Sequence, residues 1–141
     1  MQGNNLLAKT ESKIRFSEVD SLRVVWHGHY LQYFELGREA FGEQYGLSYQ
    51  SIYNNGYVTP LVKTLLEHKA PLSYGDTAII ETEYLDTKAA KIQFNYKIYS
   101  KNTGKLATTG QTTQVFVKID GGLDIIMPPF FELWKKQWNL L

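Results

Sequence analysis

The stretch from Arg15 to Gly46 reads RFSEVDSLRVVWHGHYLQYFELGREAFGEQYG, and its pattern predicts a strand, a loop and a long helix in that order. Ile14 and Phe16 alternate with polar residues, which predicts a strand that ends at Phe16. From Tyr30 on, apolar residues at positions 30, 33, 34, 37, 41 and 45 share one face of a helix. Gly46 is a suitable helix stop.

The loop within this stretch places a carboxylate and two imidazoles just before a helix. It carries Asp20, His27, Gly28 and His29. At a helix N-terminus, unpaired backbone N–H groups and the helix dipole favour negative charge. The position therefore suits the stabilisation of an oxyanion that develops during a reaction.

Length and composition narrow the class of protein. The 141 residues suggest a single domain, with residues 1–12 as a loose lead-in. A net charge of +1 gives no indication of nucleic acid or an acidic membrane surface as a partner. The chain has no cysteine, which excludes disulfides and thiolate metal sites. Without a signal-peptide pattern or an apolar run of membrane-spanning length, we expect a cytoplasmic protein.

The remainder of the chain predicts a loop, four strands and a short helix. The segment Leu47–Gly56 reads as the loop. The predicted strands are Tyr57–Ala70, Thr77–Leu85, Lys91–Tyr99 and Leu106–Ile119. Pro128 and Pro129 open the predicted helix, which has Phe131, Trp134 and Trp138 on one face.

Several residues refine these elements. Pro60 fits an edge or bulged strand, and the adjacent Ile79 and Ile80 predict a strand with both side chains buried. The strand that contains Gly110 is long enough to be bent or bulged there. Gly37 lies in the apolar stripe of the long helix, where it costs about 1 kcal/mol relative to Ala. We therefore predict a close approach of helix and sheet at that glycine.

Hairpin-like links imply an antiparallel sheet, and the long helix must bury its apolar stripe against it, which gives an α+β fold. This order resembles the hotdog fold, and the first stretch is similar to the 4-hydroxybenzoyl-CoA thioesterase family. The similarity covers about residues 12–138. The matching positions are Phe16, Asp20, Val25, Trp26, His27, Tyr30, Phe34, Glu35 and Arg38, with a second match at the turn formed by Pro71, Gly75 and Asp76.

The resemblance implies an antiparallel sheet wrapped around one long central helix, with a short C-terminal helix. It implies an acyl-CoA thioesterase without metal or organic cofactor that works as a homodimer or homotetramer. Asp20 would be the nucleophile or general base, and the backbone N–H of His27 would polarise the thioester carbonyl. Trp26, Gly28 and Tyr30 would bind substrate.

One departure concerns the residues after Asp20. The family commonly has Ala-Gly-Gly or Pro-Ala-Gly there, where this chain has Ser21, Leu22 and Arg23. Bulky residues at these positions affect the expected acyl specificity more than the expected chemistry.

Other interpretations of the same residues remain open. Asp20 by itself fits a turn residue or a helix cap. The imidazole of His27 could orient Asp20 or a water. A metal site at Asp20, His27 and His29 lacks a third nearby histidine and a recognised zinc spacing.

Glu35 and Arg38 fit an ordinary pair on a helix surface, while Glu35 and Glu39 are reserve catalytic carboxylates. Arg23, Lys69, Lys88 and Lys91 are all available for CoA phosphates, and the sequence singles out none of them. Two other functions remain open: a non-catalytic binding module for acyl-CoA or an acyl carrier, and a hotdog dehydratase. Release of free thiol from acyl-CoA separates the thioesterase from both.

Overall fold

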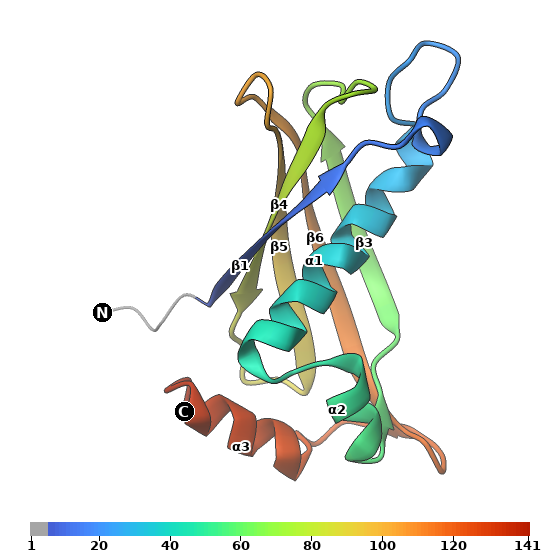
Figure 1. Ribbon diagram of the computed structural model, residues 1–141. Helices are drawn as coiled ribbons and strands as arrows, with labels where there is room; N and C mark the ends of the chain where they lie inside the picture. The colour runs from blue at the N-terminus through green and yellow to red at the C-terminus, as the bar shows by residue number, and fades with distance from the viewer. Residues whose placement is uncertain (1–5) are drawn as a thin grey trace.

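The computed structural model describes residues 6–141, which form an antiparallel sheet with a long helix on one face (Figure 1). The order β1-β4-β5-β6 makes up the body of the sheet, and β2, β3 and β7 all pair with β6. The strands are β1 (Leu7–Lys13), β2 (Tyr57–Val58), β3 (Leu61–His68), β4 (Thr77–Leu85), β5 (Lys91–Ser100), β6 (Leu106–Lys118) and β7 (Leu123–Asp124). The helices are α1 (Tyr30–Tyr45), α2 (Tyr49–Asn54) and α3 (Pro129–Gln137), with short 3-10 helices at Phe16–Glu18 and His27–His29.

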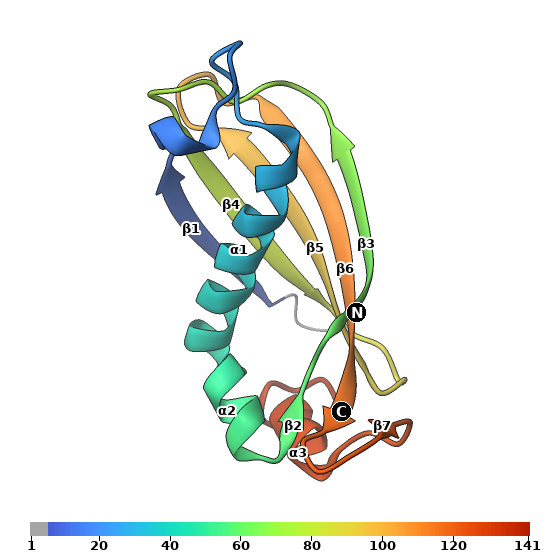
Figure 2. The same cartoon turned by 90° about the vertical axis from the view of Figure 1, so that its right-hand side faces the viewer.

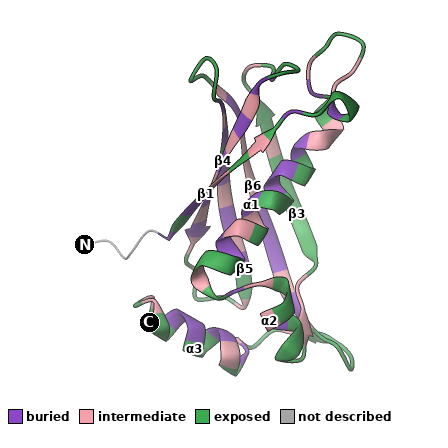
Figure 3. Cartoon of the chain, viewed as in Figure 1, coloured by how far each residue is buried: buried purple, intermediate pink, exposed green. Residues whose placement is uncertain are grey.

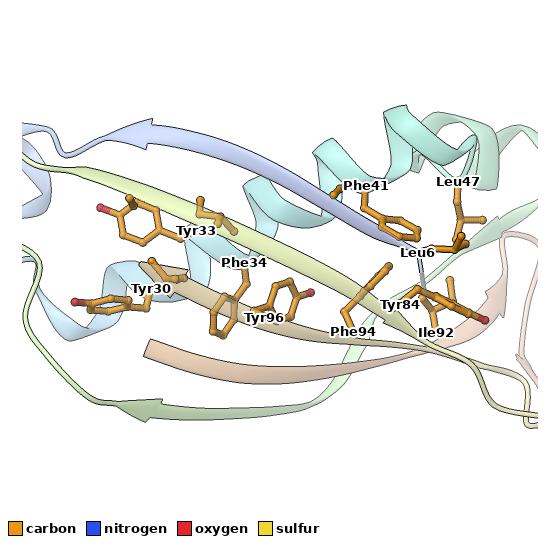
Figure 4. Packing of buried hydrophobic residues seen from close by; sticks show 14 of the residues in the cluster. Leu6, Tyr30, Tyr33, Phe34, Phe41, Leu47, Tyr84, Ile92, Phe94 and Tyr96 are labelled. Atoms are coloured by element: carbon orange, nitrogen blue, oxygen red, sulfur yellow. The ribbon is translucent and has the colours of Figure 1, made fainter. Parts of the chain in front are cut away.

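Helix α1 buries its predicted apolar stripe against the sheet (Figure 4). Phe34 stacks on Tyr96 of β5, with ring centroids 4.3 Å apart. Gly37 allows the close approach that the sequence predicted, because a Cβ there would lie 2.2 Å from the Thr82 hydroxyl and 3.0 Å from an Ile80 methyl. The α+β fold class is confirmed.

The C-terminal end of α1 is closed by α3. Gly46 adopts a left-handed conformation (φ 78°), as expected for a glycine stop. The indole N–H groups of Trp134 and Trp138 both donate to the carbonyl of Tyr45, at 2.8 and 2.9 Å. They satisfy one of the carbonyls that the helix end leaves unpaired. Trp138 lies just past the last residue of α3, where the sequence placed it inside the helix.

The helix covers the sheet unevenly. It packs on β1 and β4, while β3 lies at the opposite edge and, within residues 6–141, pairs with no strand other than β6 (Figure 2). Most of β3 is exposed (Figure 3), and its residues Leu61, Val62 and Leu65 are 40–58% exposed. A strand with one free edge and exposed apolar side chains is a typical place for another chain to pair.

The first predicted boundary was wrong. Residues 7–12 belong to β1, which pairs with β4 from Leu7↔Glu83 to Lys13↔Thr77; residues 1–5 of the expected lead-in lie outside the described residues. The strand ends before Phe16, which is 78% exposed in a 3-10 helix. The chain leaves the sheet at Ile14, whose N–H donates to the carbonyl of Asp76.

The expected loop after α1 is partly helical. Ser48 caps α2 by accepting a hydrogen bond from the N–H of Ser51, and Ile52 anchors this short helix in the core. The predicted strand from 57 to 70 is two strands, β2 and β3, separated by Thr59 and Pro60. Proline cannot donate to a strand ladder, which accounts for the break.

One further prediction of detail was wrong. Ile79 faces the outer side of the sheet and is only half-buried, whereas Ile80 is buried against the helix. Gly110 itself pairs regularly with Tyr96, and the irregularity expected near it lies where the register shifts between Ile98↔Thr108 and Tyr99↔Leu106. A Cβ at Gly110 would lie 2.2 Å from the ring of Phe34, so the glycine makes room for a helix side chain.

Candidate active site

The predicted loop is a small hairpin at the end of the molecule where α1 begins (Figure 1). Isolated bridges join Val19 to Val25 and Val24 to Ser73. The N–H of Asp20 donates to the carbonyl of Val24 at 2.9 Å. The loop is therefore held both to itself and to the segment between β3 and β4.

Glu18 fixes this hairpin to α1. The residue is buried (8% exposed), and its carboxylate accepts hydrogen bonds from the Tyr33 hydroxyl at 3.0 Å and from the Arg15 N–H at 2.9 Å. Burial, followed by the nearby Glu18 charge, raises the pKa of Tyr33 well above its usual range, so the phenol stays a donor. Sequence reasoning missed Glu18, because a glutamate in a polar run carries no signal of burial.

The carboxylate of Asp20 is half-buried and turned toward the tip of its own loop. One of its oxygens, Oδ1, accepts a hydrogen bond from the N–H of Leu22 at 2.8 Å. Across residues 6–141, no hydrogen bond joins this carboxylate to His27. The structure thus places the two predicted catalytic residues on the same hairpin and helix start without direct contact.

The start of the helix offers two free donors. Within the described residues, the N–H groups of His27 and Gly28 have no acceptor, whereas the N–H of His29 donates to the carbonyl of Trp26. The 3-10 helix His27–His29 runs directly into α1, so these donors lie at the positive end of a long helix dipole. They meet the main requirement for stabilising an oxyanion.

The ring of Trp26 leaves room only for a glycine at position 28. A Cβ on Gly28 would lie 2.1 Å from the Trp26 ring, so only glycine fits below the indole. Trp26 also contacts the rings of His27 and His29, with centroids 4.8 and 5.6 Å away, yet stays 48% exposed. The structure brings Trp26, His27 and Gly28 together at the surface.

Tyr30, predicted to bind substrate, lies deeper. It is buried, with its ring packed against Tyr33 and His68 at centroid distances of 5.8 and 4.9 Å. Burial raises the pKa of Tyr30, although hydrogen bonds with Leu72 and Thr108 oppose the shift. The sequence placed His68 far from this loop, but the direction of β3 returns it to the start of α1.

From Glu35 to its C-terminal end, α1 borders a cavity of about 880 Å³. The reserve carboxylates Glu35 and Glu39 line it, together with Arg38. Arg38 lies 3.8 Å from Glu35 and donates to the buried Tyr96 hydroxyl at 3.4 Å. The apolar floor is formed by Leu47, Ile52, Val58, Ile92 and Phe94.

Residues 6–141 contain neither a cluster of metal-ligating side chains nor a helix that could span a membrane. No group of three or more histidine, aspartate or glutamate side chains is placed to hold a metal ion. His29 instead forms a hydrogen bond with Gln32 at 3.3 Å. No helix in this part of the chain is long and apolar enough to cross a membrane.

The architecture is a hotdog fold, in which a strongly curved antiparallel sheet holds one long helix (Figure 2). Residues 14–134 match the thioesterase-like superfamily, and the chain belongs to that superfamily. A Bacillus subtilis relative named "Putative acyl-CoA thioesterase YneP" is 31% identical over 133 residues, which span 94% of this chain and 96% of the relative.

Solved structures agree with this assignment. A DHNA-CoA thioesterase from Staphylococcus aureus superposes with a TM-score of 0.82 at 25% identity, over 95% of this chain and 92% of that chain. A mutant 4-hydroxybenzoyl-CoA thioesterase complexed with 4-hydroxybenzoyl-CoA gives a TM-score of 0.79 at 20% identity, over 92% and 98% of the two chains. At that lower identity the likeness concerns the fold alone.

Proposed function

We propose that this protein is an acyl-CoA thioesterase that hydrolyses the thioester to a free acid and CoA. The observation that carries the proposal is the pair of unpaired N–H groups at His27 and Gly28, at the start of a helix that a carboxylate-bearing hairpin adjoins. Membership of the thioesterase-like superfamily and the acyl-CoA named for the relatives support the same substrate class.

In the proposed reaction, the thioester oxygen accepts a hydrogen bond from the His27 N–H, which polarises the carbonyl. Asp20 then attacks the carbonyl carbon or deprotonates the water that does so. The hydrogen bond from the Leu22 N–H holds this carboxylate in place. Trp26 borders the site as an exposed aromatic surface for the substrate.

We also propose that two copies pair through β3. Antiparallel pairing of two β3 edges would continue the sheet and cover Leu61, Val62 and Leu65, which α1 leaves exposed. A two-fold axis between the two β3 strands would place the start of α1 of one copy near α2 of the other copy. The reactive groups of one copy would then approach the cavity of the other, which is suited to an acyl group.

A screen of thiol release across short, long and aryl acyl-CoAs tests the activity. Asp20→Asn keeps the size of the side chain but removes its charge, so we expect the maximal rate to fall about 100-fold or more, with much less effect on binding. His27→Ala should cost less, since the backbone N–H survives the change.

Two outcomes would contradict the proposal. Near-normal turnover in Asp20→Asn would move the chemistry to Glu35 or Glu39, the carboxylates at the cavity. Binding of acyl-CoA without any release of thiol would leave a binding module, and dehydration of a 3-hydroxyacyl chain would indicate a dehydratase.

A further inference from the structure

Two aromatic side chains that the proposed chemistry does not use are exposed beside the Asp20 hairpin. Phe16 is 78% exposed and Tyr74 is 48% exposed, and their rings meet edge to face with centroids 6.0 Å apart. Phe16 comes from the 3-10 helix after β1, whereas Tyr74 comes from the segment between β3 and β4. Exposed aromatic rings in contact form a surface on which a nucleic acid base can stack.

Arg23 lies next to this aromatic pair. Its carbonyl accepts a hydrogen bond from the N–H of Tyr74 at 3.1 Å. Its φ of 67° is in the left-handed region, which is unfavourable for an arginine. Among the described residues the guanidinium of Arg23 has no hydrogen-bond or ion-pair partner. The chain thus holds an unpaired cation in a strained but well-anchored position.

Of the carboxylates close to these residues in the fold, that of Asp20 is half-buried and accepts a hydrogen bond from the Leu22 N–H in the same loop as Arg23, and two others are engaged inside the fold. Glu18 is occupied by Tyr33 and by the Arg15 N–H. Asp76 accepts hydrogen bonds from the Ser100 hydroxyl and from backbone N–H groups. Arg15, like Arg23, is exposed and has no ion pair in the part of the chain that the structure describes. The surface around Phe16 and Tyr74 therefore favours an anionic ligand.

We propose that Phe16, Tyr74 and Arg23 bind the nucleotide end of the CoA substrate. The adenine would stack on the face of one of the two rings, which stand nearly perpendicular to each other, and the guanidinium would bind a phosphate through paired hydrogen bonds. This inference rests on the proposed thioesterase function, because it assigns a second contact for the same substrate. Asp20 follows Phe16 by four residue steps, which span at most about 14 Å, a distance that the long pantetheine arm of CoA can bridge.

The test compares one acyl group on two carriers, CoA and pantetheine, since pantetheine lacks the nucleotide. In Arg23→Gly and Tyr74→Ala, we expect KM for the acyl-CoA to rise at least about fivefold, the scale of losing one base stack or phosphate contact. The kcat on acyl-CoA and the KM for acyl-pantetheine should stay unchanged. Equal changes on both carriers, or no change on acyl-CoA, would overturn the proposal.

Matched controls lie at the other end of the molecule. Lys136→Met removes one exposed positive charge from α3, and Tyr53→Ala removes a tyrosine that is 45% exposed on α2. Neither should change KM for acyl-CoA. Light scattering on Phe16→Ala and Tyr74→Ala shows whether the aromatic pair instead contacts a second copy of the chain. A loss of assembly in these variants would also overturn the proposal.

Binding of adenosine 3′,5′-bisphosphate, measured by calorimetry, tests the subsite independently of hydrolysis. The wild-type protein should bind this probe, and Arg23→Gly should bind it at least about fivefold more weakly. If no thioester is cleaved but the bisphosphate still binds in this way, the proposed activity fails and the nucleotide subsite stands. If thioesters are cleaved and the bisphosphate does not bind, the subsite alone is wrong.

Discussion

The two ends of α1 differ in what they present to a ligand: one presents polar groups that could react, and the other borders a cavity. At the start of the helix, the His27 and Gly28 N–H groups and the Asp20 carboxylate lie near the surface in a shallow, exposed setting. From Glu35 onward, a cavity of about 880 Å³ has an apolar floor and a rim that includes Glu35 and Glu39. The start of the helix holds the groups that could react, and the rest of the helix borders the volume that could bind an acyl chain.

The length of α1 keeps these two features apart within one chain. The cavity begins at Glu35, eight residues past His27, and continues past Gly42, fifteen residues past His27; these separations correspond to rises of about 12 and 22 Å along a helix. An acyl group held at the His27 N–H of one copy would have to extend about 12 Å before it entered the cavity of the same copy. The comparison therefore predicts that the complete site needs a second chain, brought in through the free edge of β3.

Preventing two chains from pairing through β3 should have the largest effect on assembly and activity. In the double variant Val62→Asp and Leu65→Asp, like charges would meet across the two-fold axis, and such contacts cost several kcal/mol. We expect the dissociation constant of the assembly to rise about 100-fold or more. Light scattering should then report a species near the chain mass of 16.2 kDa, and thioester hydrolysis should fall with it.

Lys13→Asp is the control for this experiment, since it adds a negative charge to the opposite edge strand, β1, and should leave the assembly intact. A double variant that stays dimeric would show that β3 is not the interface. A monomer that keeps full activity would show that the two ends of α1 do not need a second chain.

A smaller effect is expected from a substitution of Asp76, in the turn before β4, which lowers the stability of the fold. Burial acts to raise the pKa of Asp76, but hydrogen bonds from the Ser100 hydroxyl and from the N–H groups of Asn102 and Thr77 outweigh it, so the pKa lies below its ordinary value. The ionised carboxylate therefore stabilises the fold above the pKa of the unfolded chain, and this stability is lost as the pH falls through the folded pKa.

Asp76→Asn should lower the free energy of unfolding by about 1–3 kcal/mol at neutral pH, measured by urea denaturation. The difference between the variant and the wild type should shrink below about pH 4. A difference that stays constant down to strongly acidic pH would contradict the role of the ionised form. Because Asp76 lies far from the cavity, the ranking of acyl chains should not change.

The regular parts of the fold could be predicted because their signals are local and periodic. Helix α1 buries Tyr33, Phe34 and Phe41 on one face, and β4 was predicted with the bounds it has, Thr77–Leu85. The bounds of strand β1 were predicted too late in the chain because charged residues alternate with small ones over most of it, and only its pairing with β4 shows its extent. Helix α2 has six residues, too few for a helical period to show.

The candidate site likewise has one part that the sequence predicts and one part that it does not. Asp20, Trp26, His27 and Gly28 are close in sequence, so a single motif indicates them together. The neighbourhood of Tyr74 and Arg23 depends on the bridge between Val24 and Ser73, which joins segments about fifty residues apart. No local pattern encodes such a contact, and the sequence alone therefore gave no reason to choose Arg23 among the available cations.

The smallest expected effect concerns residues 21–23, the loop that follows Asp20. Leu22 is 77% exposed beside Asp20, and Arg23 holds a left-handed conformation that glycine adopts without strain. Replacing Ser21, Leu22 and Arg23 by Ala-Gly-Gly relieves that strain but adds chain entropy, so the free energy of unfolding should change by less than about 1 kcal/mol.

If the bulky side chains narrow the entrance, the same replacement should shift the relative kcat/KM of long and short acyl groups about tenfold, the scale of one poorly fitting methylene. The rate on the best substrate should change less than this ratio. Arg23→Gly alone separates the two roles of the loop, because loss of a phosphate contact weakens all acyl-CoAs alike and leaves their ranking unchanged. An unchanged ranking in the triple variant would show that specificity is set at the cavity end of α1.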